Sequence, residues 1–201
     1  GDTGWTRQSV TFTVPSTRTV QMRVGIEDRV GTVWYNGLQI EKGEIANNVN
    51  LVPNAAFSDN RGGLPFGWNY YTEEHTGDGL TADGHFRVCG KPGETRGIWR
   101  ETDLAGAGEM YVFSGWARAD SVMPDSETPL PLRLVARVNY TDGTYRDIDV
   151  PFNPACSGEQ FVSGMVDTRV NGENKPYNGI RIMAVYQNGL NTAEFWDLCL
   201  Q

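Results

Sequence analysis

The chain has 201 residues, of which 39% are hydrophobic and 21% are charged, and its net charge at pH 7 is −8. This composition is typical of a folded globular protein and argues against intrinsic disorder. The negative charge and the absence of a lysine or arginine cluster argue against nucleic acid as a partner. No apolar run is long enough to cross a membrane, so no membrane insertion is predicted.

The N-terminal part predicts a series of short strands. Residues 9–14, 20–26 and 32–40 alternate apolar with polar side chains, which is the pattern of half-buried strands. Residues 41–50 are polar and lack any periodicity, so they form the expected linker.

The last two of these strands occur a second time at the end of the chain. The corresponding positions are Met22, Val24 and Ile26 with Ile182, Ala184 and Tyr186, and Tyr35, Leu38 and Ile40 with Phe195, Leu198 and Leu200. The offset of about 160 residues is typical of a whole domain rather than of a solenoid repeat. We therefore expect residues 1–43 to be the C-terminal strands of a preceding, incomplete module, and residues 44–201 to be a complete one.

A group of three strands with one apolar face is marginally stable by itself. The apolar face of residues 1–43 is therefore expected to need a cover. Two forms of cover stay open, which are packing against neighbouring modules of the same chain and a strand-exchanged dimer.

The complete module is predicted to be all-β. Further strands are expected at residues 85–89, 97–104 and 109–119, and no segment of ten residues has a helical period. In residues 109–119, Tyr111 and Phe113 share one face, whereas Ser114 and Trp116 share the other. The expected architecture is an antiparallel β-sandwich with an extra N-terminal group of strands.

A hairpin over residues 132–152 is the most informative segment. A three-residue loop at its turn, with Gly143 in the left-handed conformation, would place Val138 opposite Ile148 and Ala136 opposite Val150. This register gathers the apolar residues on one buried face. The opposite face then carries Arg133, Arg137, Asn139, Tyr145, Asp147 and Asp149.

This polar face has the groups that a sugar requires, because hydroxyls need hydrogen-bonding partners and the apolar C–H face needs an aromatic ring. Trp116 and Ser114 are expected to share the outward face, and Trp99 is a further candidate because its neighbours are charged. The predicted glycan-binding residues are Trp116, Ser114, Arg137, Asn139, Tyr145, Asp147, Asp149 and Trp99. Two alternatives remain: Trp116 belongs to the core, and Arg137 with Asp149 is an ion pair of little consequence.

Four motifs in order carry a resemblance to a known class of domain. They are an Asn-Leu-Val-x-Asn-x-x-Phe opening at residues 50–57, Pro-x-Gly-Trp at residues 65–68, Tyr-x-Phe-Ser-x-Trp at residues 111–116, and aromatic-x-Asp-Leu-x-Leu at the end. The chain thereby resembles bacterial jelly-roll carbohydrate-binding modules of the four, nine and twenty-two type, which also occur as tandem modules of large cell-surface proteins. The resemblance implies a jelly-roll fold, a poly- or oligosaccharide as partner, and an extracellular or cell-surface location.

The resembling families often hold a structural calcium ion between an acid just after the opening Phe and an acid of the closing strand. The corresponding positions here are Ser58-Asp59 and Trp196-Asp197. Asp59 and Asp197 are therefore the candidate ligands of a structural Ca²⁺, together with backbone carbonyls. The alternative is that Asp197 caps or pairs locally. No cofactor is expected to be required.

Groups that could perform catalysis are scarce in the sequence. His75 and His85 are the only histidines and lack metal-ligand spacing, and no nucleophile motif is present. Cys89, Cys156 and Cys199 also lack metal-type spacing, and the sequence does not select a disulfide pair among them. The chain is therefore predicted not to be an enzyme. Two functions stay open: a non-catalytic glycan-binding module of a secreted or cell-surface bacterial protein, and a structural spacer or adhesion repeat with the same fold.

Overall fold

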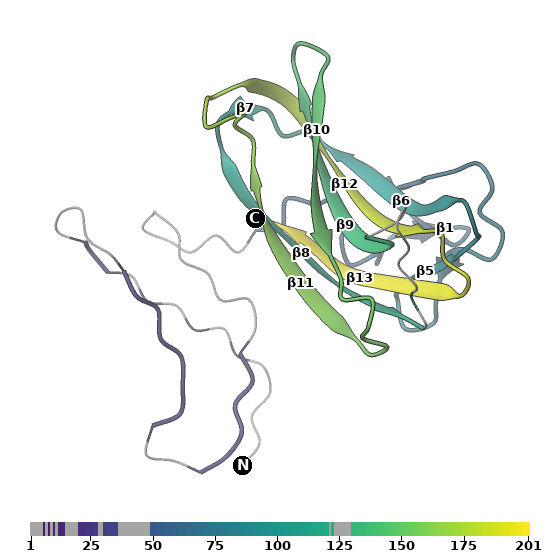
Figure 1. Ribbon diagram of the computed structural model, residues 1–201, viewed down its shortest axis with the longest axis horizontal. Helices are drawn as coiled ribbons and strands as arrows, with labels where there is room; N and C mark the ends of the chain where they lie inside the picture. Colours follow the sequence, from purple (N-terminus) through teal and green to yellow (C-terminus); the bar gives the residue numbers. More distant parts are fainter. Residues whose placement is uncertain are drawn as a thin grey trace. The chain divides into compact units, whose positions relative to one another are not determined.

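The computed structural model describes residues 49–120, 122 and 130–201, together with residues 6, 8, 10, 12–14, 20–27 and 30–35. The chain divides into two units, residues 1–48 and residues 49–201 (Figure 1). Among the described residues of the first unit, none lies in a helix or strand, so the strands expected there are not confirmed. Residues 36–40 of the last expected strand and residues 41–48 of the expected linker lie outside the described residues. The predicted boundary between residues 43 and 44 stays a prediction.

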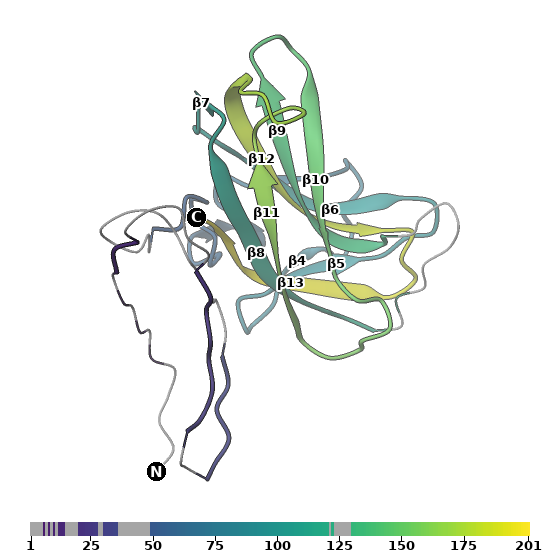
Figure 2. The same ribbon diagram turned by 60° about the vertical axis from the view of Figure 1, so that its left-hand side comes forward.

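The second unit is an antiparallel β-sandwich of two sheets, which confirms the predicted fold class (Figures 1 and 2). The sheet that we call the β12 sheet has the order β10 (Tyr145–Pro151), β9 (Leu132–Tyr140), β12 (Pro176–Gln187), β6 (Thr95–Thr102) and β3 (Asn69–Tyr70), and β7 (Gly106–Ala107) also pairs with β12. The sheet that we call the β13 sheet has the order β11 (Gln160–Asp167), β8 (Met110–Ala119), β13 (Thr192–Leu200), β5 (Phe86–Cys89) and β4 (Gly79–Leu80). A short ribbon joins β1 (Asn60–Arg61) to β2 (Leu64–Pro65). No helix in the described part of the chain is long and apolar enough to span a membrane.

The core lies between the two sheets and centres on β12 and β13. These strands are consecutive in sequence but belong to opposite sheets, and each is hydrogen-bonded on both sides. Their inward side chains are exposed by 1% or less, namely Ile180, Ile182, Ala184, Tyr186, Phe195, Leu198 and Leu200. Burial of a large apolar side chain contributes about 1.5–3 kcal/mol, so these two strands supply a large share of the stability.

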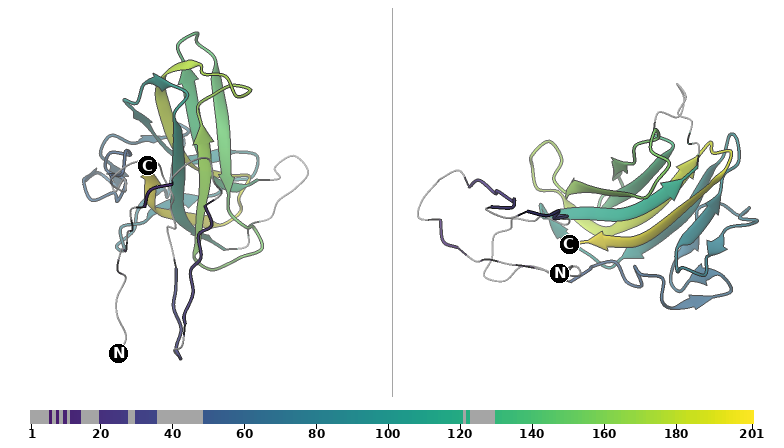
Figure 3. Two further views of the ribbon diagram at one scale, coloured as in Figure 1. Left: turned by 90° about the vertical axis from the view of Figure 1, so that its left-hand side faces the viewer. Right: turned by 90° about the horizontal axis from the view of Figure 1, so that it is seen from below.

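A β-bulge in β13 sets which of its residues face the core. The pairing with β8 shifts between Trp196 and Cys199, and Asp197 adopts a left-handed φ of 49°. In a regular strand, Phe195 and Leu198 would point to opposite faces because they are three residues apart. The extra residue of the bulge lets both side chains face the core. Figure 3 shows β8 and β13 side by side and curved along their length.

The opening segment is tied to the end of β13 by one asparagine. The Asn50 side chain donates to the Leu198 carbonyl at 2.7 Å and accepts from the Leu200 N–H at 3.1 Å. The Leu51 N–H also donates to the Leu200 carbonyl, at 2.8 Å. Trp68 is buried, and its ring packs edge-on against Phe57 with centroids 5.3 Å apart. The opening and Pro-x-Gly-Trp motifs therefore serve the core.

The β9–β10 hairpin has the predicted three-residue loop but not the predicted register. Gly143 is left-handed, with φ of 84°, and Tyr140 pairs with Thr144 across the loop. The left-handed residue comes last in such a loop, which places the loop at residues 141–143 and brings Ile148 opposite Ala136. The prediction is thus wrong by two residues. A shift by two residues leaves every side chain on the same face, because strand faces alternate with period two. The predicted division into a buried face and a polar face is therefore confirmed.

We expect the close approach of β6 and β12 to tolerate no side chain at Gly97. This residue has φ of 143°, and a Cβ atom would overlap the Ala184 carbonyl oxygen of β12. Backbone strain and overpacking should lower the free energy of unfolding of Gly97→Ala by about 2–4 kcal/mol in urea titrations. Gly158→Ala is the control, since nothing lies within 4 Å of its added Cβ. Equal losses in the two variants would contradict this packing.

Candidate functional site

The outward face of the β12 sheet carries a row of charged side chains across four strands. The row consists of Asp147, Arg137, Arg181 and Glu101, on β10, β9, β12 and β6. Arg137 donates to Asp147 from Nε and Nη2 at 2.7 and 2.8 Å, and these hydrogen bonds raise the pKa of the Arg137 guanidinium. Arg181 Nε donates to Glu101 Oε2 at 2.8 Å. Every charge in the row thus has a partner within the sheet.

An apolar strip runs beside this charged row. It consists of Val135, Met183 and Trp99, which lie opposite one another on β9, β12 and β6. The Trp99 indole donates from Nε1 to the Tyr70 carbonyl at 3.1 Å, and the Arg181 guanidinium lies 4.1 Å from its ring centroid. The indole is therefore fixed in place at the edge of the strip.

Polar and aromatic groups continue toward the β9–β10 turn. Asn139 donates from Nδ2 to Glu101 Oε1 at 2.6 Å, and Tyr145 lies opposite Asn139. The Tyr145 side chain is 59% exposed, with the Arg137 guanidinium 4.0 Å from its ring centroid. Farther from the turn in the same hairpin, Arg133 Nε lies 2.9 Å from Asp149 Oδ1.

The structure brings together six of the eight predicted glycan-binding residues. Trp99, Arg137, Asn139, Tyr145, Asp147 and Asp149 all lie on the outward face of the β12 sheet. Trp116 and Ser114 do not join them, because β8 pairs with β11 and β13 and therefore belongs to the other sheet. The alternative ion pair between Arg137 and Asp149 does not form. In the observed register, Arg137 pairs with Asp147, and Asp149 pairs with Arg133.

Sequence reasoning missed five residues of this face: Glu101, Val135, Arg181, Met183 and Tyr71. The alternation in residues 180–186 holds the signal for two of them, since Arg181 and Met183 lie between the inward Ile180, Ile182 and Ala184. Tyr71 follows β3, and its N–H donates to the Gly97 carbonyl at 2.8 Å. No sequence pattern indicates that β3 and β6 are neighbours.

The outward face of the β13 sheet carries a row of four rings. The centroids of Phe161 and Trp116 are 5.3 Å apart, those of Trp116 and Trp196 are 6.1 Å apart, and those of Trp196 and His85 are 4.1 Å apart. The planes of Trp116 and Trp196 differ by 12°, and those of Trp196 and His85 by 11°. Only Trp196 and His85 stack closely, whereas Phe161 is tilted by 54° to Trp116, and all four rings are partly buried.

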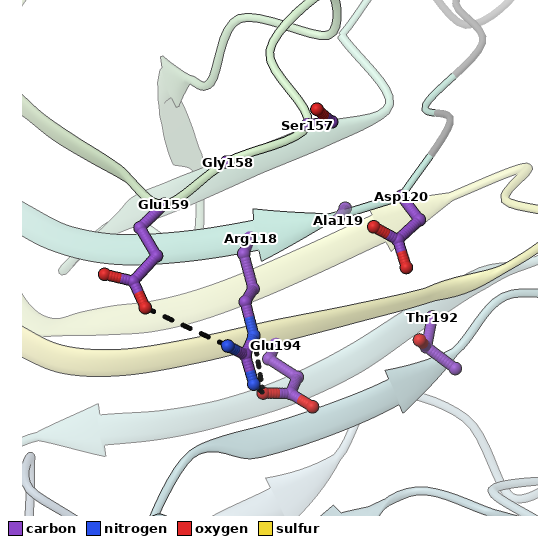
Figure 4. Close-up of a pocket in the computed structure, with 8 residues that line it drawn as sticks. All are labelled: Arg118, Ala119, Asp120, Ser157, Gly158, Glu159, Thr192 and Glu194. Atoms are coloured by element: carbon purple, nitrogen blue, oxygen red, sulfur yellow. Dashed lines mark hydrogen bonds and ion pairs between the residues drawn. The ribbon is translucent and has the colours of Figure 1, made fainter.

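A polar pocket of about 420 Å³ lies at the end of β8 on the β13 sheet (Figure 4). It is lined by Arg118, Ala119, Asp120, Ser157, Gly158, Glu159, Thr192 and Glu194. Arg118 donates to Glu194 Oε2 from Nε at 3.1 Å and from Nη2 at 2.8 Å, and His85 Nδ1 lies 3.2 Å from the same oxygen. The pocket holds none of the predicted site residues, and its one arginine is already paired.

Glu194 is the carboxylate that both Arg118 and His85 contact in that pocket. Its side chain is only 12% exposed. Burial alone would raise the pKa of this carboxyl, but the hydrogen bonds from Arg118 and His85 outweigh burial and lower it. The charged carboxylate is thus the form that the fold stabilises.

The calcium site at Asp59 and Asp197 stays a prediction. Within the part of the chain that the structure describes, no group of three or more His, Cys, Asp or Glu side chains could hold a metal ion. Asp59 is exposed, and its backbone N–H and carbonyl are both bonded to the Asn54 side chain. Asp197 is exposed on the bulge. Cys89 and Cys156 carry free thiols.

We expect Arg118→Met to destabilise the module most at neutral pH. The lowered pKa of Glu194 contributes stability above the carboxyl's ordinary pKa, and this stability is lost as the pH falls through the lowered value. The variant should lose about 1–2 kcal/mol at about pH 7, and the deficit should shrink toward about pH 3. Urea titrations at both pH values measure this.

Arg137→Met is the matched control, because its partner Asp147 is more exposed, and it should lose under about 1 kcal/mol at neutral pH. An Arg118→Met deficit that stays constant with pH would show that Glu194 is not stabilised as a carboxylate.

No family model matches the chain. Among curated proteins, it is 26% identical over 209 residues to the tRNA nuclease WapA of Bacillus subtilis and 25% identical over 208 residues to the tRNA3(Ser)-specific nuclease WapA of Bacillus spizizenii. Each alignment covers 98% of this chain but only 8% of the relative. The prediction that the protein is not an enzyme is wrong by this comparison, because these relatives are named nucleases.

Among solved structures, the chain is similar to the enzymatically active domain of bacteriophage CBA120 tailspike protein 4. The TM-score is 0.50 at 12% identity, over 75% of this chain and 21% of that one. A carbohydrate-binding module, TmCBM61 in complex with β-1,4-galactotriose, gives a TM-score of 0.46 at 13% identity, over 77% of this chain and 99% of that one. A CBM4 structure gives 0.46 at 14% identity, over 74% of this chain and 97% of that one. At these identities the likeness concerns the fold alone.

Proposed function

We propose that residues 49–201 form a glycan-binding module within a larger secreted or cell-surface bacterial protein. The observation that carries the proposal is the outward face of the β12 sheet, where an apolar strip runs beside rows of hydrogen-bonding groups. Trp99 supplies a ring at one end of this face and Tyr145 at the other. Sugars are bound by this combination, since ring faces contact C–H groups while polar side chains contact hydroxyls.

The polar groups of this face are accessible to a ligand although they are paired. The side chains of Asp147 and Asp149 are 36% and 40% exposed, so each has room to accept a hydroxyl donor in addition to its arginine. Each such bond contributes on the order of 1 kcal/mol, so we expect dissociation constants of roughly micromolar to millimolar. Several modules in one protein would raise the apparent affinity.

The length of the similar Bacillus nucleases supports the multi-module context. A segment similar to this whole chain makes up 8% of the Bacillus nucleases, so the larger protein in this proposal has room for many further modules. An enzymatic activity of that larger protein is part of the proposal. The net charge of −8 favours a neutral sugar over a polyanion as the ligand of this segment.

The experiment is a glycan array probed with the 201-residue chain and two variants. Tyr145→Ala removes an exposed ring from the β12 sheet face, and the lost stacking should weaken binding about tenfold. Met165→Ala is the matched control, because Met165 is 60% exposed on the outward face of the β13 sheet, and it should bind like the parent. If Met165→Ala loses binding and Tyr145→Ala does not, the site lies on the β13 sheet and the proposal is contradicted.

One observation favours a second candidate, the structural spacer or adhesion repeat. The charged row on the β12 sheet is internally paired and would serve equally well as a solvated surface. If the parent chain retains no glycan on the array, this second function is the one that remains.

A further inference from the structure

The repeat at the N-terminus covers the whole pair of central strands. Residues 16–41 align with residues 176–201 at a constant offset and without a gap, so they span the counterparts of β12, β13 and the connection between them. Seven inward positions of these two strands correspond to Val20, Met22, Val24, Ile26, Tyr35, Leu38 and Ile40 in the first copy, whereas the buried Tyr177 corresponds to Thr17. All seven are apolar or aromatic, as their buried counterparts are.

The backbone requirements of the two strands are repeated as well. Asp197 is left-handed at the β13 bulge, and the first copy has Gly37 there, the residue that adopts this conformation most readily. Asn188 is left-handed in the connection, with φ of 53°, and the first copy has Asp28, which tolerates that region better than most residues. This agreement is independent of the hydrophobic pattern.

The inward positions of the first copy that the structure describes are nevertheless exposed. Met22, Val24 and Ile26 are 41%, 48% and 43% exposed, whereas their counterparts in β12 are exposed by 1% or less. Tyr35 is 45% exposed, whereas Phe195 is completely buried. A face that is apolar by sequence and exposed in the structure requires a partner.

The second unit shows what that partner must supply. β12 lies between β9 and β6, and β13 lies between β8 and β5, so the pair needs four neighbouring strands. Residues 1–15 are long enough for about one strand. In residues 49–201, the places beside these four strands are already filled by that unit's own β12 and β13.

We propose that residues 16–41 are the β12–β13 pair of a second module, and that their apolar face binds a segment homologous to residues 49–167. That segment would belong to the larger protein, outside residues 49–201. The inference rests on the multi-module part of the proposed function and is independent of sugar binding.

The test is a chimeric chain in which residues 176–201 are replaced by a copy of residues 16–41. It should give a single cooperative unfolding transition by circular dichroism, because the copied residues place apolar side chains at the seven inward positions compared above. At the buried Tyr177 the copy places Thr17, which removes part of the core packing. The melting temperature should be lower than that of the parent, since Trp34 replaces Glu194 and deprives Arg118 and His85 of their carboxylate.

The matched control carries residues 15–40 at the same place. This shift by one residue turns every inward side chain outward, so the control should show no cooperative transition. Two half-chimeras, with residues 176–187 replaced by 16–27 or residues 192–200 by 32–40, test each strand separately. If all three chimeras unfold as non-cooperatively as the shifted control, the proposal is overturned. A stable dimer of the parent chain that dissociates in Val24→Asp would also overturn it, since a second copy would then be the partner.

Discussion

The structure of residues 49–201 depends on one constraint, which is that two consecutive strands occupy the centres of opposite sheets. The chain passes from the β12 sheet to the β13 sheet through residues 188–191. Each strand needs hydrogen-bonded neighbours on both sides, and each buries one face completely. The positions of β6, β9, β5 and β8 follow from this requirement. The outward face of β12 then fixes which side chains can form a binding surface.

The two outward faces of the sandwich differ in a way that bears on function. On the β12 sheet, paired arginines and carboxylates lie beside an apolar strip, and the Tyr145 ring is largely exposed. On the β13 sheet, Phe161, Trp116, Trp196 and His85 form one row of partly buried rings. Partly buried rings offer less aromatic surface to a ligand than an exposed ring that lies next to hydrogen-bonding groups. The aromatic content of a strand is therefore a weak guide to the binding face.

Strand alternation predicted which residues share a face, but not which sheet a strand joins. It grouped Arg137, Asn139 and Tyr145 correctly, because a hairpin keeps its two strands adjacent. It failed for Trp116, because β8 pairs with β11 and β13, which are separated from it in sequence by strands of the other sheet. The hairpin register failed by two residues because it depends on the position of left-handed Gly143 within the loop, which apolar patterning does not encode. Glu101 and Tyr71 became visible only through long-range pairing.

The central claim is that residues 49–201 bind a glycan on the outward face of the β12 sheet. The most direct test follows the indole N–H signals of the six tryptophans by NMR while a glycan retained by the chain is added. The Trp99 indole is held on that face by the Tyr70 carbonyl, whereas Trp116 and Trp196 lie on the other sheet. We predict that the Trp99 signal shifts with a saturable dependence on glycan concentration while the signals of Trp116 and Trp196 stay in place. A shift of Trp116 and Trp196 with Trp99 unmoved would contradict the claim.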